Sequence, residues 1–137
     1  MKYRLELDNL DILLKDLKDQ IFQKDIVVLL QGDLASGKTT LVSKFVKYIG
    51  MDDSVNSPTF SIQSRYGDNI YHYDLYNKTL DEFISLGLLE EFEKSGIHFV
   101  EWGDDSLKNI LENYGFETLT ITIDKIEDKR EYTSTTN

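Results

Sequence analysis

The chain of 137 residues is long enough for one domain of ordinary size and too short for two separate cores. Its 40% hydrophobic and 29% charged residues, with a single proline, predict a compact globule and exclude a disordered or proline-rich chain. Because 25 acidic residues outnumber 15 lysines and arginines, the net charge of -10 argues against unaided binding to nucleic acid phosphates.

The first half of the chain alternates between strand and helix patterns. Residues 2–7 alternate in polarity like a short strand, and apolar residues recur at helical spacing over residues 10–21. Residues 26–30 form an uninterrupted apolar run, which is typical of a strand buried on both faces of a parallel sheet. After a glycine-rich segment, helical spacing resumes over residues 41–49 and ends at Gly50.

The second half begins with a predicted β-hairpin over residues 59–75, with its turn at residues 67–69. Thr79 and Glu82 have the spacing of a capping box, which predicts a helix running toward Leu89, with more helix through Glu93 and a stop at Gly96. The remaining predicted elements are a strand at 97–100, a helix at 106–112 and a strand at 118–124, and the final TSTTN is expected to be loose.

Cysteine content and hydropathy restrict the setting of the protein. The absence of cysteine excludes disulfides and thiolate metal sites. The longest apolar run, at residues 26–30, is far shorter than the roughly 20 residues that a membrane span needs. The first residues, MKYRLELDNL, lack the apolar centre of a signal peptide. We therefore expect a cytoplasmic protein without a membrane association.

The strongest motif is GDLASGKT at residues 32–39, which matches G-x-x-x-x-G-K-[ST] without a mismatch. It follows the apolar run and precedes a helix, so successive backbone N–H groups can surround a phosphate at the positive end of that helix. Gly32 and Gly37 allow the tight turn. Lys38 is expected to reach the β- and γ-phosphates of a nucleotide, and the Thr39 hydroxyl is expected to bind Mg²⁺.

This motif and the order of the elements predict an α/β fold like that of P-loop NTPases. We expect a mixed sheet of central parallel strands and antiparallel hairpins, flanked by helices. A single P-loop NTPase domain would then occupy residues 1–137.

A phosphate site of this kind also needs a carboxylate near the metal and a group that senses the γ-phosphate. Glu101 closes the apolar strand at 97–100 and is the first candidate for the carboxylate. Asp74, at the end of the YHYD segment, is the second. The SPTF segment at residues 57–60 offers a hydroxyl that could act as a switch, although Ser-Pro-Thr is also an ordinary turn sequence.

Several other features have simpler explanations. The segment at residues 77–81 resembles a guanine-reading NKxD but carries an extra residue, so GTP is not inferred. His72 and His98 are far apart and lack a neighbouring ligand, which favours core or hairpin histidines over metal ligands. Trp102, taken alone, is a core or rim aromatic residue.

The negative charge is concentrated in residues 81–105, where eight acidic residues stand against Lys94 alone. This segment is either a solvated helical face or a docking surface for a basic partner, and charge patterning leaves both interpretations open.

Five segments together resemble one family, the bacterial TsaE (YjeE) ATPases, which take part in making threonylcarbamoyladenosine beside the anticodon of tRNA. The segments are GDLASGKTTLV (32–42), SPTF (57–60), YHYDLY (71–76), LGLLEEF (86–92) and VEW (100–102). Their order and spacing cover nearly the whole chain, which makes the resemblance far more specific than the glycine-rich motif alone.

The resemblance implies roles for individual residues. Thr39 and Glu101 become the Mg²⁺ ligands, and Thr59 becomes the switch hydroxyl. Asp74 and Trp102 become further active-site residues, together with Lys38. The implied ATP-binding loop consists of Gly32, Asp33, Leu34, Ala35, Ser36, Gly37, Lys38, Thr39 and Thr40.

The chain departs from the family pattern at a few positions. The family usually has glycine at position 35, where this chain has Ala35, and the alanine is expected to alter slightly how the loop fits phosphates. An arginine common after TTLV is replaced by Ser43 and Lys44. The arginine that typically follows DLY is replaced by Asn77, so one positive charge is missing there unless Lys78 supplies it.

The resemblance implies ATP hydrolysis with Mg²⁺ in support of a TsaB–TsaD heterodimer, in which TsaD carries the transferase chemistry, so tRNA is reached only through the complex. The chain has only Arg4, Arg65 and Arg130, too few to clamp a phosphoryl acceptor, which disfavours a small-molecule kinase. We expect a weak ATPase that a partner activates. A nucleotide-gated switch or scaffold module without essential hydrolysis remains the alternative.

Overall fold

The structure is a computed structural model that describes residues 2–6, 9–33, 36–51 and 62–136. Within these residues the strands are β1 (Lys2–Leu5), β2 (Ile26–Gln31), β3 (Gln63–Tyr66), β4 (Ile70–Asp74), β5 (Ile97–Glu101), β6 (Thr118–Ile126) and β7 (Lys129–Thr136). The helices are α1 (Asp11–Ile21), α2 (Lys38–Tyr48), α3 (Leu80–Ser85), α4 (Leu88–Glu91) and α5 (Asp105–Asn113).

The strands form one mixed sheet in the order β1-β7-β6-β2-β5-β4-β3. β2 is parallel to both of its neighbours, β5 and β6, and β4 is parallel to β5. β1, β7 and β3 add antiparallel pairs toward the two edges. This arrangement confirms the predicted α/β fold with central parallel strands, antiparallel hairpins and flanking helices.

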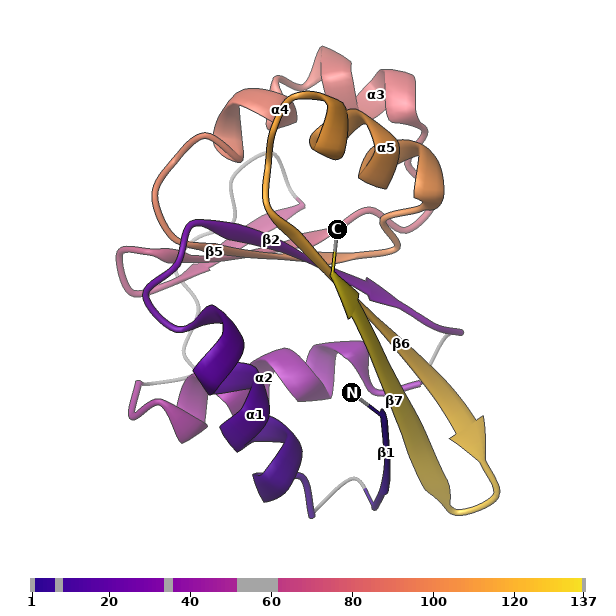
Figure 1. Cartoon of the computed structure of the whole chain (residues 1–137). Helices are drawn as coiled ribbons and strands as arrows, with labels where there is room; N and C mark the ends of the chain where they lie inside the picture. Colours follow the sequence, from indigo (N-terminus) through magenta and orange to yellow (C-terminus); the bar gives the residue numbers. More distant parts are fainter. Residues whose placement is uncertain (1, 7–8, 34–35, 52–61, 137) are drawn as a thin grey trace.

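Helices cover both faces of the sheet. α1 and α2 lie on one side, and α3, α4 and α5 lie on the other (Figure 1). Two hydrophobic clusters fill the two interfaces, and the apolar run at residues 26–30 contributes to both because its alternate side chains point to opposite faces. All five of its residues are buried, as an uninterrupted apolar run predicts.

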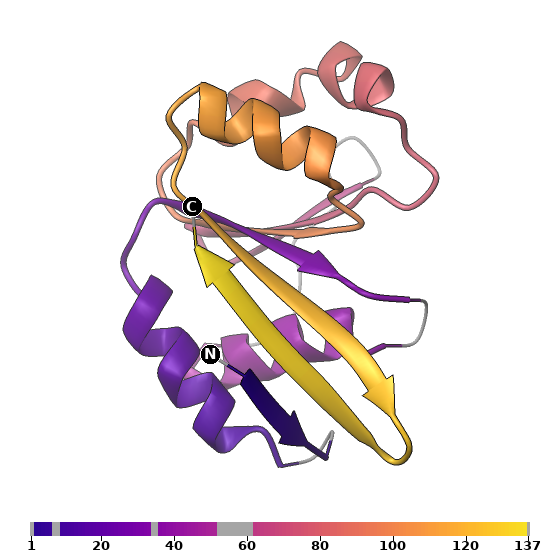
Figure 2. The ribbon, with the colours of Figure 1, turned by 45° about the vertical axis from the view of Figure 1, so that its right-hand side comes forward.

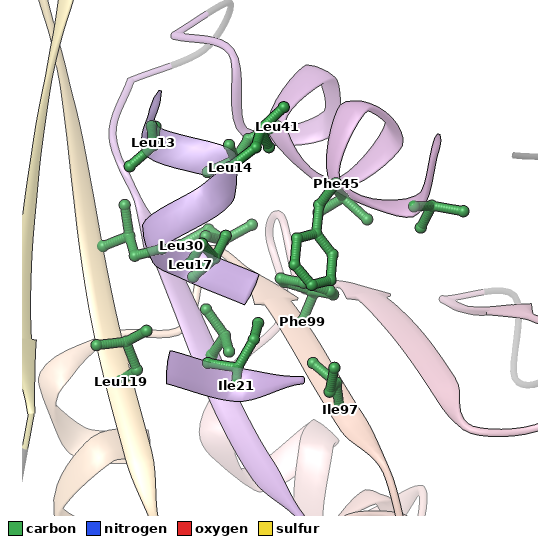
Figure 3. Packing of buried hydrophobic residues seen from close by; sticks show 14 of the residues in the cluster. Leu13, Leu14, Leu17, Ile21, Leu30, Leu41, Phe45, Ile97, Phe99 and Leu119 are labelled. Atoms are coloured by element: carbon green, nitrogen blue, oxygen red, sulfur yellow. The ribbon is translucent and has the colours of Figure 1, made fainter. Parts of the chain in front are cut away.

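The cluster beneath α1 and α2 joins both helices to the centre of the sheet (Figure 3). The ring of Phe45 in α2 meets that of Phe99 in β5 edge to face, with 5.6 Å between their centroids. Leu13 and Leu17 of α1 are also buried in this cluster. The start of α2 is therefore held in a fixed position relative to β2 and β5.

Register places the carboxyl ends of three parallel strands side by side. Leu30 of β2 and Asp74 of β4 both stand opposite Glu101 at the end of β5. The chain leaves β2 for α2 on one face, whereas α5 carries it from β5 to β6 on the other face. Ligands of open α/β sheets commonly bind at such a point, where successive connections diverge.

Two expectations from the sequence need correction. The predicted long helix after Thr79 is split into α3 and α4, because Gly87 adopts a left-handed conformation with φ of 76° between them. The capping box of Thr79 and Glu82 is confirmed.

The expectation of a loose TSTTN end is also wrong, because residues 133–136 belong to β7. This strand pairs with β6 on one side and β1 on the other (Figure 2). Only Tyr132 of β7 is buried, so the strand lacks an apolar alternation, and its pairing depends on neighbours that are distant in the sequence. None of the described helices is long and apolar enough to cross a membrane.

The packing of Phe45 predicts a strong effect on stability. Phe45→Ala should lower the free energy of unfolding by about 3–5 kcal/mol, because it leaves a cavity between α2 and β5. Tyr114→Ala is the control, since Tyr114 is 71% exposed. Urea unfolding of both variants checks the prediction, and equal losses of stability in the two would contradict it.

Candidate functional site

The glycine-rich loop connects the end of β2 to the start of α2, as predicted. At Gly32 the backbone φ is 150°, and a Cβ there would lie 2.5 Å from the carbonyl oxygen of Ile123 in β6. Gly37 has a left-handed φ of 109° and precedes the first residue of α2. Both positions therefore require glycine for a physical reason. Leu34 and Ala35 lie outside the described residues.

Lys38 is buried and folded back onto the loop. Its Nζ donates hydrogen bonds to the carbonyl oxygens of Gly32, at 2.5 Å, and Asp33, at 3.0 Å. The same ammonium lies 3.8 Å from the centroid of the Trp102 ring, in cation–π geometry. Burial lowers the pKa of Lys38, although the negative charges of Glu101 and Asp33 act in the opposite direction.

Glu101 is only 5% exposed, and two donors share one of its oxygens. The Thr39 hydroxyl donates to Oε2 at 2.8 Å, and Nε2 of His72 contacts the same oxygen. Burial by itself would raise the pKa of Glu101, but the hydrogen bonds from His72 and Thr39 and the nearby positive charges lower it overall. Glu101 is thus held as a carboxylate beside the first turn of α2.

Trp102 and Asp74 flank this pair of residues. Trp102 adopts a left-handed φ of 68°, and its ring lies 5.0 Å from that of Tyr76. Asp74 is exposed, and its Oδ1 accepts a hydrogen bond from the Tyr76 backbone N–H at 3.1 Å. Asp74 stands opposite Glu101 in the sheet, so both carboxylates lie at the carboxyl ends of the adjacent strands β4 and β5.

The structure brings most of the predicted residues together. The end of β2, the start of α2 and the end of β5 supply Gly32, Asp33, Ser36, Gly37, Lys38, Thr39, Glu101 and Trp102. Thr40 lies in the first turn of α2 and is half-buried. Thr59 and the whole SPTF segment lie outside the described residues, so their predicted role as a switch has no structural counterpart here.

Sequence reasoning missed His72, which lies beside Glu101. A signal for it was available, because His72 is two residues before Asp74 in β4 and side chains two apart share a face. His98 is a core residue, as expected. It is buried, and its ring nitrogens meet the Tyr73 hydroxyl at 2.7 Å and the Lys94 carbonyl at 2.8 Å.

Arg130 was also missed as a member of the site. Its Nε donates to the Ser36 carbonyl oxygen at 3.0 Å. No local pattern indicates this contact, because it depends on the pairing of β7 with β1 and β6.

The acidic segment at residues 81–105 is partly explained by local contacts. Glu82 completes the capping box of α3, Glu91 pairs with Lys94 at 2.9 Å, and Asp104 caps α5 through the Leu107 N–H at 2.9 Å. Together with Glu101, four of the eight acids thus have a role inside the fold. The other four, all lying at exposed or surface positions of this segment, are Asp81, Glu90, Glu93 and Asp105.

Comparison with known proteins agrees with this geometry. The family model described as threonylcarbamoyl adenosine biosynthesis protein TsaE matches residues 6–132. The TsaE protein of Bacillus subtilis (strain 168) is 41% identical over 113 residues, covering 80% of this chain and 68% of that protein. The TsaE protein of Treponema pallidum (strain Nichols) is 31% identical over 112 residues, covering 80% of each chain.

A solved structure is similar over almost the full length. The crystal structure of YdiB from Bacillus subtilis superposes with a TM-score of 0.69 at 31% identity, covering 99% of this chain and 84% of that chain. Fold and sequence together define an α/β protein of tRNA modification. The chain belongs to the TsaE family of tRNA threonylcarbamoyladenosine biosynthesis.

The lowered pKa of Glu101 predicts how stability depends on pH. Its carboxylate stabilises the fold above the ordinary pKa of 4.5, and this contribution is lost as the pH falls through the lowered pKa of the folded state. Glu101→Gln should therefore be less stable than the natural chain at pH 7, with a difference that shrinks in acid. Urea unfolding from pH 7 to pH 3 measures it, with Glu93→Gln as the exposed control. A difference that grows toward acid would contradict the prediction.

Proposed function

We propose that this chain is an ATPase that binds ATP with Mg²⁺ and supports a TsaB–TsaD complex in the threonylcarbamoyladenosine modification of tRNA. The observation that carries the proposal is the convergence of Lys38, Thr39 and Glu101 at the adjoining ends of β2 and β5. A cation, a hydroxyl and a carboxylate at the start of a helix are the groups that nucleotide triphosphates and their metal require.

The loop and Lys38 account for phosphate binding in this proposal. The ammonium of Lys38 is held by two neutral carbonyl oxygens of its own loop. Phosphate oxygens are stronger acceptors because they are charged, so a bound nucleotide would draw Lys38 away from Gly32 and Asp33. The backbone N–H groups at the start of α2 would hold the same phosphates.

The donor set fits Mg²⁺ better than a metal that needs several protein ligands. Thr39 and Glu101 offer hard oxygen atoms 2.8 Å apart. Among the described residues, no group of three or more histidines and acids could hold a metal by itself. Mg²⁺ commonly binds through one or two protein oxygens, the substrate phosphates and water. When bound, it would neutralise charge on the reacting phosphates.

His72, which the sequence did not predict as a site residue, and the remaining predicted residues have supporting roles in the proposal. His72 holds the Glu101 carboxylate in place through its Nε2. Asp74 ends β4 beside Glu101 and is exposed, so it can hold water near the metal. Trp102 covers the Lys38 ammonium, and Thr59 is proposed as the switch hydroxyl on the basis of the family pattern.

Activity of the isolated chain should be low. The proposed hydrolysis has few cations available to stabilise charge in the transition state, since the chain has only three arginines. We propose that the TsaB–TsaD partner raises the rate and that tRNA is reached only through this cytoplasmic complex. The exposed acids of residues 81–105 are a candidate contact for basic groups of that partner.

A second candidate function is a nucleotide-gated switch or scaffold that needs ATP binding without turnover. The small number of arginines favours it as an alternative, because few cations are available to stabilise the transition state of hydrolysis. A small-molecule kinase is disfavoured by the shortage of arginines.

The position of Lys38 predicts a loss of nucleotide affinity on its removal. Lys38→Ala should weaken ATP binding by roughly 10- to 100-fold, because a hydrogen bond to a charged group contributes about 1.5–3 kcal/mol. Calorimetry with Mg²⁺ measures the affinity. Lys47→Ala, an exposed lysine at the other end of α2, is the matched control. Unchanged affinity in Lys38→Ala would overturn the placement of the site.

The two candidate functions differ in what Glu101 does. Glu101→Ala should retain ATP binding within a fewfold but lose phosphate release and the support of tRNA modification by TsaB and TsaD. Phosphate release is measured for the natural chain alone and with both partners, with Lys38→Ala as the blank. A several-fold rise with the partners supports the ATPase. Full support of tRNA modification by Glu101→Ala would instead favour the switch without hydrolysis.

A further inference from the structure

The glycine-rich loop is held from outside by Arg130, a residue 94 positions away in the sequence. Nε of Arg130 donates to the Ser36 carbonyl oxygen at 3.0 Å, and Nη1 donates to the Lys129 carbonyl oxygen at 3.3 Å. The side chain is half-buried. Because strand residues two apart share a face, Arg130 points to the same side of β7 as Tyr132, which belongs to the core beneath α1 and α2.

The same hairpin supports the loop at a second point. A Cβ at Gly32 would lie 2.5 Å from the carbonyl oxygen of Ile123 in β6. The loop thus touches β6 at its first residue and β7 just before α2 begins. β6 and β7 form one long antiparallel hairpin toward the sheet edge, which gives both contacts a common rigid base (Figure 2).

Peptide geometry connects the Arg130 contact to the inside of the loop. The described residues contain no cis peptide bond, so the peptide between Ser36 and Gly37 is trans and planar. In a trans peptide the C=O and the following N–H point in opposite directions. With the Ser36 carbonyl directed at Arg130, the Gly37 N–H must point away from β7.

Gly37 makes this orientation easy to lose. Its left-handed φ of 109° is one that glycine alone adopts at little cost, and glycine also tolerates the backbone angles of a rotated peptide. A rotated peptide would turn the Ser36 carbonyl oxygen, the negative end of the dipole, toward the inside of the loop. A donor that binds the Ser36 carbonyl oxygen from outside the loop, as Arg130 does, favours the observed orientation over the rotated one.

We infer that Arg130 is a positioning residue that fixes the Gly37 N–H so that it can donate to a phosphate of the bound nucleotide. The inference rests on the proposed nucleotide binding. Arg130 does not need to touch the nucleotide, because it acts through the Ser36 carbonyl. The pairing of β7 with β1, which holds Arg130 in place, thereby contributes to nucleotide affinity.

Arg130→Gln tests this inference, with Lys129→Gln as a matched control. Lys129 precedes Arg130 in β7, is exposed and carries the same charge, so its removal changes the net charge equally without removing the contact with Ser36. Calorimetry with ATP and Mg²⁺ gives the affinity, thermal unfolding gives the stability, and ¹⁵N–¹H spectra of the nucleotide-free protein report the Gly37 amide.

Arg130→Gln should weaken ATP binding about tenfold or more, since one charged hydrogen bond from the backbone is lost. It should also shift the Gly37 amide signal. Lys129→Gln should bind within twofold of the natural chain and leave that signal in place. Arg130→Lys, which keeps one charged donor, should recover part of the affinity and guards against a folding defect in the glutamine variant.

The outcomes separate this inference from the proposed function. If the natural chain does not bind ATP, the proposed function is wrong, while the Gly37 signal still decides whether Arg130 orients the peptide. If the natural chain binds ATP and Arg130→Gln binds equally well with an unchanged Gly37 signal, the inference is overturned and the proposed function stands.

Discussion

The parallel pairing of β2 with β5 is the constraint on which the site depends. Its register places Leu30 beside Glu101. The loop that follows β2 and the acid that ends β5 therefore meet at the carboxyl ends of these two central strands. The buried contact between Phe45 and Phe99 fixes α2 against β5, which brings Thr39 within 2.8 Å of Glu101. Hydrophobic packing on one face of the sheet thus determines the distance between Thr39 and Glu101 at the carboxyl ends of the strands.

The charged groups at the carboxyl ends of β2 and β5 are satisfied by contacts within the chain. The buried carboxylate of Glu101 accepts from Thr39 and contacts His72, while Lys38 is bonded to loop carbonyls and covered by Trp102. A buried charge without partners would destabilise the fold, so these contacts allow the site to exist at all. In the proposed function, the contact between Thr39 and Glu101 would place both oxygen ligands of the metal side by side.

The hairpin of β6 and β7 gives the site a second support from the opposite direction. The loop is confined between α2, which packs on the core, and the hairpin, which meets it at Gly32 and Ser36. In the proposed function, backbone N–H groups hold a phosphate only when they point toward it, so the support from this hairpin would contribute to binding. The hairpin of β6 and β7, although far from the loop in sequence, is therefore part of the structure that positions it.

The sequence by itself determined most of the elements and the residue types gathered at the candidate site. The apolar run of β2, the strand–loop–helix order around residues 32–39 and the capping box at Thr79 are local signals, and the structure confirms each because neighbouring residues produce it. Glu101 and Trp102 followed from a strand end and from the family pattern. The tertiary structure alone decided that β7 forms, that His72 touches Glu101 and that Arg130 holds Ser36. These contacts join segments far apart in the chain, and strand order and register, which no local pattern encodes, bring them together.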